Sequence, residues 1–156
     1  MDSVLWSKLF SISTKLSKNK WTSIHRETRD GFGANDFYRE CYGVAITLTV
    51  VKTTNGNIFG CYTNLPWSSS FDIIDYIAIT DSFLVWLMKK INHLLKCLKN
   101  KVVTFSFLSS WGPVFGNKSG NSDIYIASDS NMNTKSYSIL GNGFERTGKS
   151  PDAEFL

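Results

Sequence analysis

Residues 46–62 read ITLTVVKTTNGNIFGCY, two runs of β-forming residues separated by a polar turn. Threonine, valine, isoleucine and aromatic residues dominate the two runs, as is typical of strands. Asn55-Gly56 lies between them, and both residue types tolerate the positive φ angles of a type I′ turn, whose twist matches the flanking strands. The sequence therefore predicts a β-hairpin of residues 46–52 and 58–62, closed across Asn55-Gly56.

Apolar residues spaced three or four apart predict two helices before this hairpin. One spans residues 3–17, with lysines on its polar face. The other spans residues 35–41, where Phe37 and Cys41 lie four apart and so face the same way, toward the core. The apolar stripe of the first helix consists of Leu5, Leu9, Ile12 and Leu16.

Short runs of β-branched or aromatic residues follow the hairpin, separated by clusters of Gly, Ser and Asn. The runs predict strands at 102–108, 123–127 and 136–140, and the polar clusters predict surface loops at 109–121 and 128–135. This pattern indicates an α+β domain, mainly β, in which two packed antiparallel sheets form a β-sandwich with flanking short helices.

Composition fits one soluble domain. The chain has 156 residues, of which 42% are hydrophobic and 19% charged, enough for a single core. Its net charge of +4 is concentrated at 89–101. Three cysteines without C-x-x-C spacing, and no secretory signal, predict a cytoplasmic location. The most apolar run, 73–88, is interrupted by two aspartates, so no membrane span is expected.

Chemistry-bearing residues are few. His25 and His93 are the only histidines; we interpret His25 as a partly exposed structural residue and His93, whose neighbouring lysines disfavour its charged form, as a surface residue. Cys41 and Cys61 stand at a helix end and inside a strand, positions that do not lower a thiol pKa. No spacing typical of a metal, dinucleotide or nucleotide-phosphate site is present, so we expect neither metal nor cofactor.

Two separated blocks of the sequence carry a further pattern of glycine and aromatic residues. The first contains Arg29-Asp30-Gly31-Phe32, Phe37, Cys41, residues 47–53, Asn55-Gly56, Ile58-Phe59-Gly60 and Tyr62. The second contains residues 112–116 (GPVFG), 123–126 (DIYI) and 136–138 (SYS). In order and spacing these blocks resemble the TLDc domain, the module of eukaryotic oxidation-resistance proteins.

The resemblance divides the chain into an N-terminal helical segment, 1–20, and a TLDc-like domain, 21–156. Relatives continue past the position of Phe155-Leu156 with a last strand, so the resemblance implies that this C-terminal strand is missing and that stability is marginal. It also implies protection against oxidative stress and association with subunits of the V-type ATPase, with contact to a membrane only indirectly. No agreed catalytic residues accompany the family, so we expect a non-enzymatic protein-interaction module.

The segment 81–100 supports two interpretations. Its apolar residues keep helical phase from Asp81 to Lys99, which indicates an amphipathic helix. The resemblance instead places a strand at 82–87, and we favour that strand, with 89–100 irregular or briefly helical.

Several charged and aromatic side chains are candidates for binding a partner or for orienting a loop. Charged residues beside the Gly31 turn can pair as Arg–carboxylate ion pairs or serve as an exposed binding surface. Aromatic residues can be interface anchors or core. The candidates are Arg26, Arg29, Asp30, Trp67, Trp111 and Glu145.

Two other classes of function remain open. A small hydrolase or peroxide-reducing enzyme would use Cys41 or Cys61 and would show a reactive native thiol. A basic surface-binding module would use lysines 89–101 on acidic membranes or nucleic acid, without specific recognition of the nucleic acid.

Overall fold

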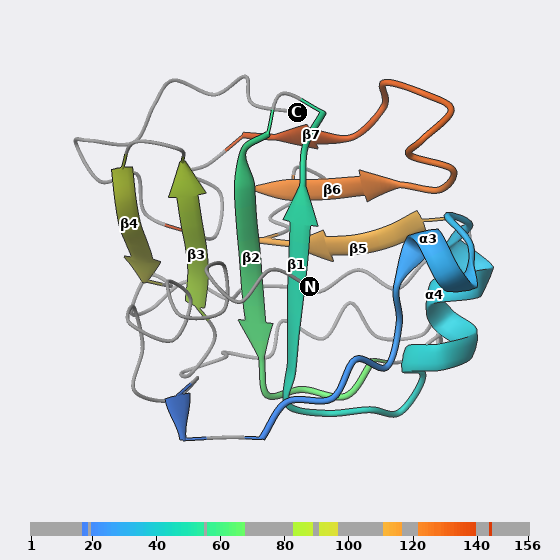
Figure 1. Ribbon diagram of the computed structural model, residues 1–156, viewed down its shortest axis with the longest axis horizontal. Coiled ribbons are helices and arrows are strands. Elements are labelled where there is room, and N and C mark those ends of the chain that lie inside the picture. Colours follow the sequence, from blue (N-terminus) through green and yellow to red (C-terminus); the bar gives the residue numbers. More distant parts are fainter. Residues whose placement is uncertain are drawn as a thin grey trace.

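Two antiparallel β-sheets and two short helices make up the described part of the computed structural model (Figure 1). The structure describes residues 17–18, 20–54, 56–67, 111–116, 122–139 and 144, together with the strands at 83–88 and 91–96. The predicted fold class is confirmed: the domain is α+β, mainly β, with two antiparallel sheets.

The first sheet contains the predicted hairpin. Its strands are β1 (Thr47–Lys52), β2 (Ile58–Thr63), β3 (Phe83–Met88) and β4 (Ile91–Lys96), which lie in the order β1-β2-β3-β4. Every neighbouring pair is antiparallel. Both hairpin strands are confirmed to within one residue at each end.

The turn of the hairpin differs from the prediction. The ladder runs to the pair Lys52 and Ile58, and Thr53 then donates its N–H to the carbonyl of Asn57 at 2.9 Å. Gly56 donates to the carbonyl of Thr53 at 2.9 Å and has a φ of 84°. The connection is therefore longer than a two-residue type I′ turn, with glycine in the left-handed region, as three-residue hairpin loops require.

The middle of the chain forms a second hairpin. The strand predicted at 82–87 is confirmed as β3, whereas the expectation that 89–100 is irregular or briefly helical is wrong at 91–96, where β4 pairs with β3. The helical spacing of apolar residues in this segment does not correspond to a helix. Leu94 and Leu95 instead pair with Val85 and Leu84 across the ladder. Tertiary pairing overrides the local pattern here.

The second sheet consists of β5 (Trp111–Phe115), β6 (Ile124–Ala127) and β7 (Tyr137–Ser138), in that order. The strands predicted at 123–127 and 136–140 are confirmed in shorter form. The surface loop predicted at 109–121 is wrong at 111–115, because β5 is a strand whose last four residues are buried. Gly112 and Pro113 favoured a loop in the prediction, because both residue types are depleted in strands. They lie where the register shifts between Trp111 and Val114, an irregularity at which a ladder tolerates proline.

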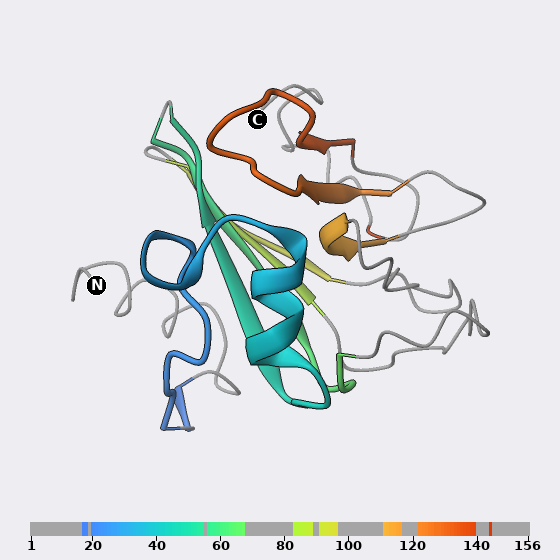
Figure 2. The same cartoon turned by 90° about the vertical axis from the view of Figure 1, so that its right-hand side faces the viewer.

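Two helices pack beside the sheets. They are α3 (Glu27–Asp30) and α4 (Ala34–Cys41), and α4 confirms the helix predicted at 35–41. Figure 2 shows α4 in front of the space between the sheets. The predicted helix at 3–17, the predicted strand at 102–108 and the C-terminal residues discussed above lie outside the described residues, apart from Ser17. None of the helices described is long and apolar enough to cross a membrane.

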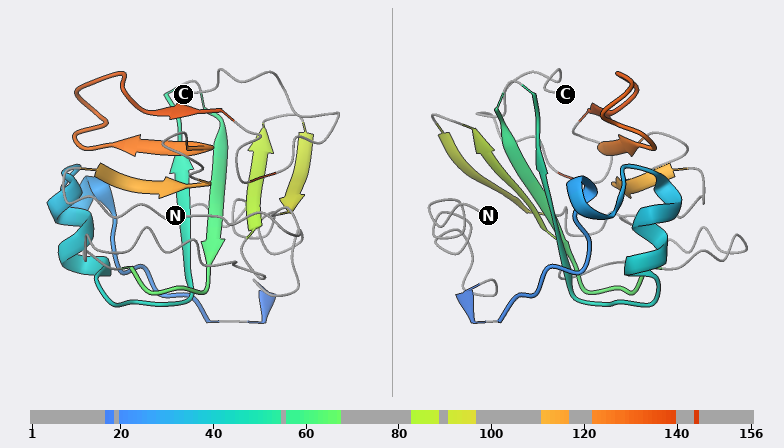
Figure 3. Two further views of the ribbon diagram at one scale, coloured as in Figure 1. Left: turned by 180° about the vertical axis from the view of Figure 1, so that it is seen from behind. Right: turned by 45° about the vertical axis from the view of Figure 1, so that its right-hand side comes forward.

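One core joins the two sheets and α4. The oblique view in Figure 3 shows the two sheets facing each other with α4 beside them. Trp67 stands at its centre. Its ring packs edge-on against Phe37 of α4 at 4.8 Å and against Phe115 of β5 at 5.8 Å between ring centroids. The buried cluster comprises Phe37, Tyr38, Cys41, Phe59, Cys61, Trp67, Phe115, Ile124, Ile126 and Phe144.

Candidate functional site

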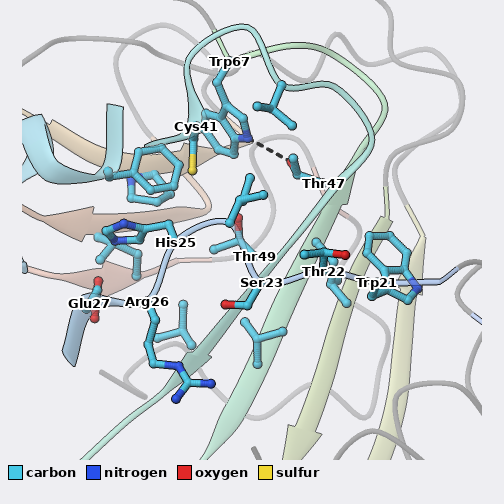
Figure 4. A pocket seen from close by; sticks show the side chains of 18 of the residues that line it. Trp21, Thr22, Ser23, His25, Arg26, Glu27, Cys41, Thr47, Thr49 and Trp67 are labelled. Atoms are coloured by element: carbon cyan, nitrogen blue, oxygen red, sulfur yellow. Dashed lines mark hydrogen bonds between the residues drawn. The ribbon is translucent and has the colours of Figure 1, made fainter. Parts of the chain in front are cut away.

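A cavity of about 800 Å³ opens at the β1 edge of the sandwich. Its walls are the extended segment 20–26 with the start of α3, strand β1 and, at its inner end, the core residues Cys41, Trp67 and Ile126 (Figure 4). Its volume lies in the range of ligand-binding pockets. The lining combines apolar side chains with hydroxyl groups, among them those of Ser23 and Thr49.

Charge around the cavity is predominantly positive. Lys20, Arg26 and Lys52 line it and are exposed, whereas Glu27 is half-buried. Burial raises the pKa of the Glu27 carboxyl. Among the described residues, none forms an ion pair with the exposed Arg26 side chain.

The Arg29–Asp30 pair fixes the loop at one end of this cavity. Arg29 donates Nε–H to Oδ1 of Asp30 at 2.6 Å and Nη2–H to Oδ2 at 2.7 Å, a bidentate pair. Oδ2 of Asp30 also accepts the backbone N–H of Arg26 at 2.7 Å, and Arg29 reaches the carbonyl of Ile24 at 3.2 Å. The hydrogen bonds from Arg29, above all, hold the pKa of Asp30 well below its usual range. Asp30 therefore ties together both ends of the 24–30 segment.

His25 lies against this ion pair. Its side chain is only 10% exposed, its Nδ1 is 3.7 Å from Oδ2 of Asp30, and its ring packs edge-on against Phe37 at 5.5 Å. Burial lowers the pKa of His25, and this effect outweighs the opposing attraction of the nearby carboxylates, of which Asp30 is the strongest. A neutral imidazole at neutral pH follows.

The two described cysteines are buried. Cys41 is 3% exposed and Cys61 is 1% exposed. Burial, reinforced by the negative charges of Glu40 and Asp30, raises the pKa of Cys41 to about 12. This is the opposite of the depressed pKa that activates a nucleophilic thiol.

The candidate residues proposed from the sequence lie in different parts of the structure. Arg26 lines the cavity, whereas Arg29 and Asp30 form their ion pair beside it, joined to Arg26 through its backbone N–H. Trp67 is 2% exposed and donates its indole N–H to Oγ1 of Thr47 at 2.9 Å, so it belongs to the core and forms the inner wall of the cavity. Trp111 lies on the other sheet, where its ring packs against Tyr125 at 5.4 Å. Glu145 is outside the described residues.

Sequence reasoning missed the cavity itself. Its lining comes from stretches far apart in the chain, 20–28, 44–52, Trp67, Pro113 and Ile126. The extended segment before α3 carries no periodicity that would mark it as a wall. The cationic side chains at 20, 26 and 52 are a weak signal, because their convergence depends on the fold. Among the described residues, no cluster of three or more His, Cys, Asp or Glu could hold a metal ion.

The geometry defines a small two-sheet α+β domain with an open, positively charged cavity at one sheet edge. A comparison with protein families gives the family of this domain: the family model of the TLDc domain matches residues 1–155. The chain belongs to the TLDc family. The match includes the N-terminal segment 1–20, which the sequence interpretation had separated from the domain. No individual curated protein matched the chain.

Proposed function

We propose that this chain is a non-enzymatic protein-interaction module that associates with the V-type ATPase and contributes to protection against oxidative stress. Membership of the TLDc family supports the proposal, because this is the function that its resemblance to other family members implies. The observation that carries a binding role is the open cavity with its exposed cations Lys20, Arg26 and Lys52. Exposed positive charge beside a cavity favours recruitment of an acidic partner.

The titratable groups described at the cavity support binding over catalysis. Asp30 is committed to Arg29, His25 is neutral and packed on Phe37, and the Cys41 thiol stays protonated. A general base or a nucleophile would need a free partner within hydrogen-bond reach. A cysteine-dependent enzyme remains the alternative, and native thiol reactivity distinguishes the two.

The test is a pull-down with purified V-type ATPase, using the whole chain as bait. The variant Arg26→Glu reverses a cavity cation, and Lys135→Glu reverses an exposed lysine in the β6–β7 loop, away from the cavity lining. We expect ATPase subunits to be enriched by the wild type and by Lys135→Glu, and at least about tenfold less by Arg26→Glu. Absence of enrichment by the folded wild-type chain would refute the association.

A further inference from the structure

Strand β1 is the outermost described strand of the first sheet. The hydrogen-bond pattern between β1 and β2 shows which backbone N–H and C=O groups of β1 point away from β2. Thr53 donates its N–H to Asn57 across the hairpin. Since hydrogen-bonded pairs alternate along an antiparallel ladder, Val51, Thr49 and Thr47 direct their backbone groups toward β2. The N–H and C=O groups of Leu48, Val50 and Lys52 therefore point away from β2.

The geometry at Gly60 agrees with this pattern. A Cβ atom placed on Gly60 of β2 would lie 2.6 Å from the backbone oxygen of Thr49, so that carbonyl faces β2. Among the described strands, none pairs with the other side of β1. An edge strand with free backbone groups is a template for pairing with another extended chain.

The cavity runs along this same edge. Residues 46–52 form one wall, and the extended segment 20–26 forms the opposite wall. Thr47 and Val51 face the core, since Thr47 accepts the Trp67 indole N–H and Val51 packs on the core cluster. A chain laid against β1 would therefore direct every second side chain into the cavity, toward Cys41 and Ile126.

We propose that the slot between β1 and the segment 20–26 binds an extended segment of a partner protein, which adds to the sheet as a strand beside β1. The backbone of Leu48, Val50 and Lys52 supplies the hydrogen bonds, as in other cases of strand addition. The partner strand carries apolar residues at alternate positions, which enter the cavity, and acidic residues between them. This inference rests on the proposed function and names the site that serves it.

Charge decides the nature of the occupant. Lys20, Arg26 and Lys52 border the slot, whereas the half-buried Glu27 is the carboxylate in its lining. An acidic strand is complementary to this surface. A second copy of the chain is disfavoured, because its own β1, with the sequence TLTVVK, contains a lysine and no acidic residue. Pairing of two β1 strands would bring like charges together.

The experiment uses the whole chain and a fluorescent synthetic peptide of about eight residues in which valine alternates with glutamate, a length typical of strands. Fluorescence anisotropy measures its affinity. A matched peptide has lysine in place of glutamate, and two further versions carry N-methyl groups on either the glutamate or the valine amides. Hydrogen exchange follows the amides of Leu48, Val50 and Lys52 with and without the glutamate peptide.

The expected results follow from which backbone groups of β1 point away from β2. The glutamate peptide binds at least about tenfold more tightly than the lysine peptide and slows exchange at all three amides. Residues opposite Leu48, Val50 and Lys52 in an antiparallel strand have side chains on the same outer face, so methylation of the glutamate amides should abolish binding. Methylation of the valine amides should not. If the peptide instead adds parallel to β1, methylation of the valine amides should abolish binding and methylation of the glutamate amides should not. That result would also support strand pairing.

A pair of protein variants provides the second arm. Val50→Pro removes an outward-facing N–H without removing a bond to β2, a position where edge strands tolerate proline. Val50→Thr keeps that N–H. We expect Val50→Pro to bind the peptide at least about tenfold more weakly than Val50→Thr. The peptide and hydrogen-exchange arms need no substitution, so the proposal stays testable if Val50→Pro fails to fold.

Three outcomes would overturn the proposal. They are equal effects of the two methylated series, absence of peptide binding to the folded chain, and a concentration-dependent dimer that Val50→Pro abolishes, which would make a second copy the occupant. The failure of the proposed function can be distinguished from the failure of strand addition. Enrichment of the V-type ATPase that is insensitive to Val50→Pro would refute strand addition alone, whereas peptide binding without ATPase enrichment would refute the ATPase association alone.

Discussion

His25 and its neighbours are held in fixed protonation states by their surroundings. Burial against Phe37 lowers the pKa of His25 below its ordinary value of 6.5, whereas Arg29 lowers that of Asp30. Unfolding returns both groups to their ordinary pKa values. Acidification therefore favours the unfolded chain, which binds the proton of the histidine before the folded chain does.

The first prediction concerns the pH dependence of stability. The contribution of a neutral buried His25 is fully present above pH 6.5 and is lost as the pH falls from 6.5 toward the lower pKa of the folded state. The free energy of unfolding, measured with urea, should fall more between pH 7.5 and 5.5 in the wild type than in His25→Gln. Parallel pH profiles for the two proteins would show that the histidine is not desolvated in the folded state.

The second prediction concerns thiol reactivity. In a Cys97→Ser background, Cys41 and Cys61 remain, and both are buried. Burial raises the pKa of Cys41 to about 12 and keeps reagents away from both thiols, so neither should react with a disulfide reagent until the chain unfolds. Absorbance of the released thiolate, followed in buffer and in denaturant, provides the measurement. Rapid, pH-dependent reaction of one native thiol would favour the cysteine-enzyme alternative.

At the scale of elements, the turn after β5 depends on one glycine and one buried carboxylate. Asp123 is fully buried, and its N–H donates to the carbonyl of Phe115 at 2.9 Å. Its Oδ2 accepts the N–H of Phe144 at 3.1 Å. Gly116 has a φ of 72°, and a Cβ atom there would overlap the Asp123 carboxylate. Asp123 thus links the end of β5 through its backbone N–H and Phe144 through its carboxylate, which keeps this position only while residue 116 has no side chain.

The third prediction compares two glycines with the same φ angle. Gly43 also has a φ of 72°, but a Cβ atom there would meet nothing within 4 Å. Gly43→Ala should cost only the left-handed strain, about 1–2 kcal/mol. Gly116→Ala should cost at least about 1 kcal/mol more, because the buried carboxylate must move. Chemical denaturation measures both variants, and equal losses would mean that Asp123 adapts without cost.

At the scale of the whole molecule, both sheets and α4 share one core. Phe59 and Cys61 come from the first sheet, Phe115 and Ile124 from the second, and Trp67 packs against α4 and β5. A shared core predicts that the sheets unfold together, because neither retains its buried face without the other.

The fourth prediction tests this coupling. Phe115 is 1% exposed, and Phe115→Ala should lower the free energy of unfolding by about 3–5 kcal/mol through lost burial and a residual cavity. Far-ultraviolet circular dichroism and tryptophan fluorescence should shift to the same lower melting temperature. Met132→Ala is the control, since Met132 is 82% exposed and its truncation should change stability by less than about 0.5 kcal/mol. Two separated transitions would contradict a single core.

Local chemistry determined the elements whose pairing partner is near in sequence. The hairpin 47–63 followed from alternating β-formers around a glycine turn, α4 from Phe37 and Cys41 four residues apart, and β6 from a short branched and aromatic run. The bidentate Arg29–Asp30 pair involves adjacent residues and was anticipated as one of two roles for that cluster. These features need few contacts from distant parts of the chain, so the sequence alone contains their cause.

Only the tertiary structure decided the rest. Strand β5 contains Gly112 and Pro113, which locally oppose a strand, and it forms because β6 pairs with it across a register shift. Strand β4 has helical spacing and forms because β3 supplies a ladder. The cavity exists because residues 20–28 lie opposite the outer edge of β1, along which no described strand pairs, a juxtaposition of separate segments. The physical reason is the same in each case: non-local pairing and burial outweigh local preferences that differ by about 1 kcal/mol per residue.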